Sequence, residues 1–309
     1  MALIIKPGRD PAENWIKAIN GKISDLEIRV WPDCGNLEDI EFALVSHIPH
    51  GELARFPNLR FVASTAAGVD ELLADPDLSH DVPIIHGVNS ERSDTMAQTV
   101  LLHVLRYHRH LQVYGEQQSR HEWKRYPLVP ADERRVGIMG LGALGSVAAA
   151  RLVQSGFDVA GWTRRPKTID GVTNFHGADG LGPFLGRTGI LVCMLPLTAE
   201  TEDVINANTL AALPKGAFVI NCARGAHLVD EDLIAALDSG HIAGATLDVF
   251  RTEPLAPDHP FWDHPRITIT PHTSSQGRAA FGVDVLVENM RRARAGEPLV
   301  NLVDREAGY

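Results

Sequence analysis

A glycine-rich turn is the first segment of the sequence whose residue types indicate a chemistry. Gly140-Leu-Gly-Ala-Leu-Gly145 fits the pattern G-x-G-x-x-G and lies between a strand-like run, RVGIMG, and an alanine-rich helical run, SVAAARLVQ. In this pattern the first glycine allows a tight turn, the second lets a pyrophosphate approach the backbone, and the third lets helix and strand pack closely. The unpaired N–H groups and dipole of the helix N-terminus attract an anion. With the next strand, DVAGWT, the segment predicts a dinucleotide-binding βαβ unit, whose expected ligand contacts are Gly140, Gly142, Ala143, Leu144 and Gly145.

A basic segment, GWTRRPK, follows the second strand of this unit at residues 161–167. In NAD-binding proteins a carboxylate at this strand end accepts a hydrogen bond from the ribose 2′-hydroxyl. NADP has a phosphate at that position, which a carboxylate would repel and arginine binds through a fixed fork of donors. The segment offers a hydroxyl and three cations, from Thr163, Arg164, Arg165 and Lys167. It predicts NADP (NADPH) as the cofactor, with NAD as the alternative if these residues form only a solvated basic loop.

Three further polar residues lie where later strands are expected to end. Arg224 follows a buried run in NCARG, Glu253 lies in LDVFRTEPL, and His272 follows the run ITITP. Open α/β sheets bind their ligands at the carboxyl ends of strands. An arginine can hold a 2-oxo acid by its carboxylate and carbonyl. A histidine, whose unperturbed pKa is about 6.5, can protonate the carbonyl oxygen near neutral pH, and a neighbouring carboxylate fixes its tautomer. In this order, downstream of the dinucleotide-binding turn, the three residues form a specific candidate for a catalytic site.

The elements that must position these residues alternate between strand-like and helical runs. In the first third of the chain, residues 42–47, 59–65 and 82–87 are apolar runs rich in Val, Ile and Phe, which is typical of buried strands. From Arg134 on, strand-like runs alternate with helical segments, one of which opens with acidic residues and closes at Gly240. This alternation predicts parallel sheets covered by helices on both faces, and hence an α/β fold.

Two Rossmann-like domains are expected. The first, the substrate or catalytic domain, is predicted to be discontinuous, with residues 1–92 completed by residues 273–309. Residues 93–272 are predicted to form the NAD(P)-binding domain. A long helical pattern begins near Asp94 and indicates a helix that joins two domains or packs against another subunit. The last helical run covers residues 276–295.

Composition narrows the class of protein. The 309 residues suffice for two domains, and 44% hydrophobic and 22% charged residues are ordinary for a soluble globular chain. The net charge of −10 argues against a general nucleic-acid binder, and no apolar run is long enough to cross a bilayer. The N-terminal stretch lacks the basic region of a signal peptide. The scattered residues Cys34, Cys193 and Cys222 form neither a disulfide framework nor a zinc spacing. We therefore expect a cytoplasmic protein without a metal, and without nucleic acid or membrane as a partner.

The motifs GLGALG, NCARG, LDVFRTEPL and PHTSS resemble those of the D-isomer-specific 2-hydroxyacid dehydrogenases, over essentially the whole chain. Within that family the chain is most similar to the glyoxylate/hydroxypyruvate reductase A type, through GWTRRPK, MLPLTAET, LVDEDLIAALDSGHIAGATLDVF, HPRITITPH and the terminal GY. The resemblance implies a formate/glycerate dehydrogenase-like architecture and a homodimer formed through the cofactor domain and residues 95–126. It also implies NADPH-preferring reduction of a small 2-oxo acid to the D-2-hydroxy acid. Ser46 departs from that type, which usually has a tryptophan there, lining the substrate pocket.

The same resemblance implies roles for individual residues. Arg224 would bind the substrate carboxylate and keto oxygen, His272 would be the acid–base, and Glu253 would be its partner. In the segment AAGVD, the backbone N–H groups of Gly68 and Val69 would bind the carboxylate, with Ala67 beside them. The other residues expected to line the cofactor are Leu195, Pro196, Thr201, Cys222, Ala223, Asp248 and Ser274, together with Arg224 and His272.

Two alternatives stay open on the sequence. Transcriptional corepressors that sense dinucleotides share this fold and the Arg–Glu–His set, so the chain could be a binding module. The other alternative is an NAD-dependent dehydrogenase of another acid, such as a phosphorylated hydroxy acid. A phosphorylated substrate would need extra cations in the first domain, for which Arg55 and Arg60 are the candidates.

Overall fold

The computed structural model describes residues 1–8, 11–66, 68–87, 90–275 and 279–308, except for the side chains of residues 279–281. The chain divides into two compact units. Unit 1 comprises residues 1–92 and 277–309, and unit 2 comprises residues 93–276. Unit 2 ends at residue 276 and not at residue 272 as expected, because the turn that carries His272 belongs to the same unit as the strand before it.

Unit 2 is built on a seven-stranded parallel sheet with the strand order β12-β11-β10-β9-β6-β7-β8. The strands are β6 (Arg135–Met139), β7 (Asp158–Thr163), β8 (Val172–His176), β9 (Ile190–Cys193), β10 (Ala217–Asn221), β11 (Ile242–Leu247) and β12 (Ile267–Ile269). The chain runs outward from β6 through β7 and β8, then returns to β9 and runs outward on the other side. The strand order therefore reverses between β6 and β9, which is where open α/β sheets bind ligands.

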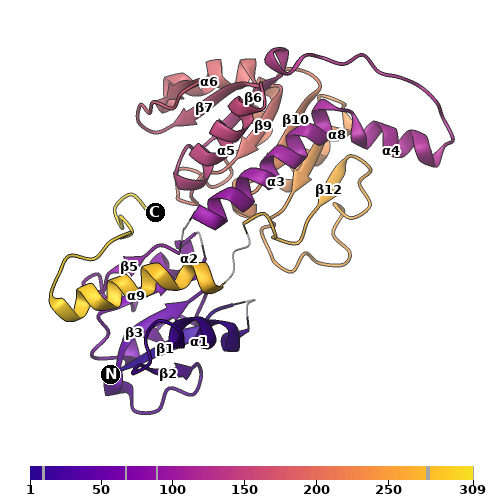
Figure 1. Ribbon diagram of the computed structural model, residues 1–309. Helices are drawn as coiled ribbons and strands as arrows, with labels where there is room; N and C mark the ends of the chain where they lie inside the picture. Colours follow the sequence, from indigo (N-terminus) through magenta and orange to yellow (C-terminus); the bar gives the residue numbers. More distant parts are fainter. Residues whose placement is uncertain (9–10, 67, 88–89, 276–278, 309) are drawn as a thin grey trace. The chain divides into compact units, whose positions relative to one another are not determined.

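Helices cover both faces of this sheet (Figure 1). One face is covered by α3 (Ser90–His108) and α5 (Ala143–Gln154), and the other by α6 (Gly177–Arg187), α7 (Ala207–Ala212) and α8 (Asp230–Asp238). Tyr107 anchors α3, since its ring stacks on Phe218 with centroids 4.2 Å apart and its hydroxyl lies 2.7 Å from that of Thr246. Burial raises the pKa of Tyr107 to about 12. Helix α4 (Leu111–Ser119) and the segment after it extend away from the sheet (Figure 1).

Unit 1 has a five-stranded parallel sheet with the order β2-β1-β3-β4-β5. Its strands are β1 (Ala2–Lys6), β2 (Glu27–Val30), β3 (Ile40–Val45), β4 (Phe61–Ser64) and β5 (Ile84–Ile85). Its helices are α1 (Ala12–Asn20), α2 (Asp70–Leu73) and α9 (Ala279–Ala295). Helices α1 and α9 bury Trp15, Ile19, Leu286 and Met290 in one core with the sheet. The short 3-10 helices of the chain are η1 (Leu37–Asp39), η2 (Leu53–Arg55), η3 (Ala131–Glu133) and η4 (Gly225–His227).

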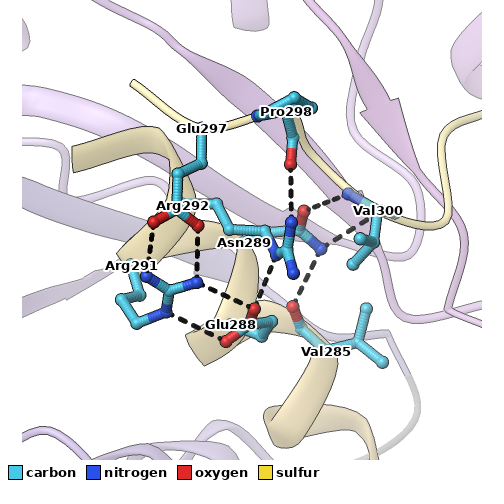
Figure 2. A network of polar contacts seen from close by, with 8 residues as sticks. All are labelled: Val285, Glu288, Asn289, Arg291, Arg292, Glu297, Pro298 and Val300. Atoms are coloured by element: carbon cyan, nitrogen blue, oxygen red, sulfur yellow. Dashed lines mark hydrogen bonds and ion pairs between the residues drawn. The ribbon is translucent and has the colours of Figure 1, made fainter. Parts of the chain in front are cut away.

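A polar network fastens the segment after α9 to that helix (Figure 2). Arg291 donates to the carboxylates of both Glu288 and Glu297. The fully buried Asn289 accepts from the backbone N–H of Val300 at 2.8 Å, and its amide donates to the carbonyl of Val300 at 3.2 Å. These contacts direct the C-terminal segment to β5, with which it forms an antiparallel bridge.

The predicted α/β fold with two parallel sheets is confirmed. Two strands, β2 and β8, were not anticipated, because each is only partly buried and lacks a continuous apolar run. Helix α3 begins at Ser90 and not near Asp94, and the first residues of the last expected helix, 276–278, lie outside the described residues. No helix within the described ranges is both long enough and apolar enough to cross a membrane.

Candidate active site

The glycine-rich turn follows β6, and two of its three glycines are required by the backbone or by close packing. Gly140 has φ +96°, in the left-handed region that favours glycine. A Cβ at Gly145 would lie 2.0 Å from the carbonyl oxygen of Gly140, so the close packing of α5 on the turn requires a glycine. A Cβ at Gly142 would meet no atom within 4 Å. The turn therefore leaves open space before the first residues of α5, Ala143 and Leu144, which suits a pyrophosphate at the helix N-terminus.

Residues 163–167, the polar part of the basic segment, lie beside this turn. The ammonium of Lys167 donates to the carbonyl of Leu141 and to Oγ of Ser146, the latter at 3.1 Å. Arg164 and Arg165 are exposed, and no carboxylate occurs in the segment. Cations without an acid at the end of β7 suit a dinucleotide with a 2′-phosphate.

His272 and Glu253 form a hydrogen-bonded pair at the carboxyl edge of the sheet. Nδ1 of His272 lies 2.8 Å from Oε2 of Glu253, while Oε1 accepts from the backbone N–H of Phe250 at 3.1 Å. The side chains are 41% and 27% exposed, so the pair is open to a ligand without being fully solvated. Glu253 thus orients the imidazole through Nδ1, and the acid–base role of His272 remains a prediction.

Asp248 anchors the turn that carries His272. Its carboxylate is 1% exposed and accepts from Oγ1 of Thr270 at 2.5 Å and from the backbone N–H groups of Thr273 and Ser274, both at 2.9 Å. A buried carboxylate is tolerated when donors of this kind satisfy its oxygens. His272 itself has φ 54°, a left-handed conformation that this anchored turn maintains. The predicted contact of Asp248 with the cofactor remains a prediction.

Arg224 lies on the turn after β10, and buried polar side chains fix its backbone. Nδ2 of the fully buried Asn221 donates to the carbonyl of Arg224 at 2.9 Å. The fully buried His227 accepts from the N–H of Arg224 through Nδ1 at 3.2 Å and donates through Nε2 to the carbonyl of Pro196 at 3.2 Å. His227 therefore ties the Arg224 turn to the Pro196 segment. Sequence reasoning missed it, since a lone histidine in a turn carries no signal of its own.

Gly225 brings the Arg224 turn against the segment that leads to Glu253. A Cβ at Gly225 would lie 1.8 Å from the carbonyl carbon of Phe250, so only glycine allows this approach. The predicted residues Arg224, Glu253 and His272 thus lie on adjoining turns, after the neighbouring strands β10, β11 and β12.

The other predicted cofactor residues of unit 2 lie along the same edge. Leu195, Pro196 and Thr201 follow β9, and Oγ1 of Thr201 donates to the carbonyl of Pro196 at 2.6 Å. Cys222 and Ala223 are buried after β10, where Oγ of Ser274 donates to Sγ of Cys222 at 3.5 Å. Burial raises the pKa of the Cys222 thiol to about 12, so the thiol is neutral and not a nucleophile, and its contact with the cofactor remains a prediction.

The predicted carboxylate-binding segment belongs to unit 1. Gly68 and Val69 follow β4 and precede α2, and Val69 is buried. Ala67 lies outside the described residues. These residues therefore lie at the carboxyl edge of the sheet in unit 1, the edge at which this type of sheet binds ligands.

Comparisons with known proteins agree with this geometry. Residues 101–274 match the family model described as D-isomer specific 2-hydroxyacid dehydrogenase, NAD binding domain. The chain is 39% identical over 305 residues to the glyoxylate/hydroxypyruvate reductase A of Serratia proteamaculans, covering 96% of each chain.

Two solved structures are similar over the whole chain. One is a D-isomer specific 2-hydroxyacid dehydrogenase from Xanthobacter autotrophicus in complex with NADPH and MES, with a TM-score of 0.96, 43% identity, and coverage of 100% of this chain and 99% of that one. The other is the NADPH-dependent glyoxylate/hydroxypyruvate reductase from Sinorhizobium meliloti in complex with NADP and sulfate, with a TM-score of 0.93, 34% identity and full coverage of both chains. The chain belongs to the D-isomer-specific 2-hydroxyacid dehydrogenase family.

Proposed function

We propose that this protein reduces a small 2-oxo acid, of the glyoxylate or hydroxypyruvate kind, to the D-2-hydroxy acid and prefers NADPH over NADH. The observation that carries the proposal is the Glu253–His272 pair beside the Arg224 turn, at the carboxyl edge of a dinucleotide-binding sheet. Two relatives that are each 39% identical to this chain over 96% of its length are named glyoxylate/hydroxypyruvate reductase A.

Each of the three residues has one task in this proposal. The guanidinium of Arg224 binds the substrate carboxylate and the keto oxygen, which orients the carbonyl carbon and favours negative charge on its oxygen. His272 donates a proton to that oxygen through Nε2. Glu253 accepts from Nδ1, which keeps the proton on that nitrogen and orients the ring. A bound nicotinamide supplies the hydride.

The remaining predicted residues complete the binding site. In the proposal, unit 1 is the substrate domain, and the backbone N–H groups of Gly68 and Val69 bind the carboxylate. Unit 2 binds the dinucleotide at the glycine-rich turn and along the edge that carries Pro196, Thr201 and Asp248. Arg164 and Arg165 bind the 2′-phosphate.

A substrate and cofactor screen tests this function. The rate of NADPH and NADH oxidation is measured with glyoxylate, hydroxypyruvate and larger 2-oxo acids, and kcat/KM is compared. Absence of turnover with every 2-oxo acid would refute the reductase and favour a dinucleotide-sensing module. A wild type that prefers NADH would refute the assignment of the basic segment.

The double variant Arg164→Ala, Arg165→Ala isolates the phosphate contact. A hydrogen bond to a charged group is worth about 1.5–3 kcal/mol, so losing one should lower kcat/KM for NADPH roughly ten- to a hundredfold. The loss should shrink at high salt because both arginines are exposed. NADH should be little affected, and so should the control Arg135→Ala, an exposed arginine at the opposite end of β6. Equal losses for both cofactors would show that the arginines do not bind the phosphate.

We further propose that the protein is a homodimer in the cytoplasm. Leu102, Leu105, Leu111 and Trp123 are exposed along α3, α4 and the segment after them, and Trp123 is 93% exposed. Several exposed apolar residues on neighbouring segments of the chain are typical of a subunit interface. Light scattering should give twice the chain mass for the wild type and the monomer mass for the double variant Leu102→Glu, Leu111→Glu.

The proposed location in the cytoplasm rests on the cysteines. All three are free thiols, which a reducing compartment maintains. Fractionation of cells that express the tagged chain tests the location.

A further inference from the structure

Asn174 in β8 makes side-chain hydrogen bonds to two residues of the basic segment, and the role of this segment in the proposed function leaves these bonds unexplained. Its carboxamide oxygen accepts from the backbone N–H of Lys167 at 2.9 Å. Its amide nitrogen donates to Oγ1 of Thr163 at 3.0 Å and to the carbonyl of Phe175 at 3.2 Å. One side chain thus contacts both the first and the last residue of the segment 163–167.

Thr163 connects Asn174 to the backbone of Arg165. Its hydroxyl accepts from Asn174 and donates to the carbonyl of Arg165 at 2.7 Å. Hydrogen bonds therefore hold the segment at the hydroxyl of Thr163, the carbonyl of Arg165 and the N–H of Lys167. Both arginines lie between the two ends that Asn174 contacts.

The register of the sheet explains why Asn174 can reach the segment. Asn174 pairs with Gly161 in β7, so the two residues point to the same face of the sheet. A Cβ at Gly161 would lie 2.3 Å from Leu141, so the glycine-rich turn packs directly on this face. Asn174 consequently lies on the face that carries the turn, beside the segment that would hold the 2′-phosphate.

We propose that Asn174 is a positioning residue for cofactor specificity, which holds the segment 163–167 in the conformation that presents Arg164 and Arg165 to a 2′-phosphate. This inference rests on the proposed NADPH preference. Asn174 acts through the arginines. Ordering a loop on binding lowers affinity, so a segment whose backbone Asn174 already holds avoids that loss when the two arginines bind the phosphate.

Equilibrium binding to the intact protein tests the inference without turnover. Titration calorimetry measures the Kd of NADP⁺ and of adenosine 2′,5′-bisphosphate, and compares them with NAD⁺ and 5′-AMP, which lack the 2′-phosphate. Asn174→Ala should weaken both phosphorylated ligands about tenfold and change the other two by less than about twofold. The matched control is Asn206→Ala, which removes another partly buried asparagine of unit 2, the N-cap of α7, and should change no affinity.

Asn174→Asp is nearly isosteric and serves if the alanine variant does not fold. It retains the acceptor for Lys167, cannot donate to Thr163, and adds a negative charge beside the phosphate site, so NADP⁺ affinity should fall at least as far and should depend on salt. Undiminished NADP⁺ binding in these variants, or equal losses for phosphorylated and unphosphorylated ligands, would overturn the role of Asn174. Wild-type protein that binds NAD⁺ as tightly as NADP⁺ would instead overturn the proposed function.

Discussion

Replacing Asp248 with asparagine should destabilise the His272 turn far more than it weakens cofactor binding. The asparagine has nearly the same shape, but one of its two polar atoms must become a donor. The least costly orientation places the amide where Oδ2 now accepts from Ser274, which leaves that buried N–H without an acceptor, at a cost of about 1–3 kcal/mol. The bonds from Thr270 and Thr273 survive as neutral bonds and lose about 1 kcal/mol each. Relief from burying a charge offsets part of this, so we expect a net loss of about 3 kcal/mol.

Hydrogen exchange measured by mass spectrometry reports this loss locally. The amides of the peptide that contains Thr273 and Ser274 should exchange about a hundredfold faster in Asp248→Asn, since 1.4 kcal/mol corresponds to a factor of ten. The value of kcat should fall because His272 lies on the same turn, while KM for NADPH should change little. The control Asp238→Asn alters a carboxylate that is 71% exposed and should shift stability by less than about 0.5 kcal/mol. Unchanged exchange combined with a large rise in KM for NADPH would refute the anchoring role and support a direct cofactor contact.

Four further outcomes are expected. Gly225→Ala should lower kcat and the unfolding midpoint together, because its Cβ would stand 1.8 Å from a backbone carbon; a variant with wild-type kinetics would contradict the close approach. His272→Ala should lower the reduction rate roughly 10²–10⁴-fold. Glu253→Gln should lower kcat, because an amide is a weaker acceptor than a carboxylate for the Nδ1 proton of His272; a kcat equal to that of the wild type would refute the pairing. Hydrogen bonds from Arg291 and its neighbour lower the pKa of Glu288 to about 2 from the ordinary 4.5. The ionised pair therefore stabilises unit 1 fully above pH 4.5 and loses this contribution as pH falls towards 2. Urea unfolding across that range should show a flatter pH dependence in Arg291→Gln, and parallel curves would contradict the assignment.

The sequence predicts those features of the site that depend on neighbouring residues, and it does not predict those that depend on packing between distant segments. The glycine turn was predictable because Gly140 and Gly145 meet local steric requirements. The position of Arg224, Glu253 and His272 at one edge of the sheet was predictable because each follows an apolar strand. His227 and Asn174 were missed for the opposite reason. Their partners are backbone groups of other segments, so nothing in the residues around them indicates a contact. The anchoring role of Asp248 was also missed, since its donors Thr270, Thr273 and Ser274 converge on it only after β11 and β12 have paired.

The antiparallel bridge between the C-terminal segment and β5 has a consequence for how the protein behaves at high concentration. An open edge strand offers unpaired N–H and C=O groups to other molecules and invites aggregation. Here Val303 donates to the carbonyl of Ile84, and His86 donates to that of Asn301, so the chain satisfies the edge of β5 with its own residues. At the opposite edge, β2 places Glu27 and Arg29 in an ion pair that extends to Asp39. The two edges of one sheet thus resist intermolecular pairing by different means, one by occupying its hydrogen bonds and the other by charge.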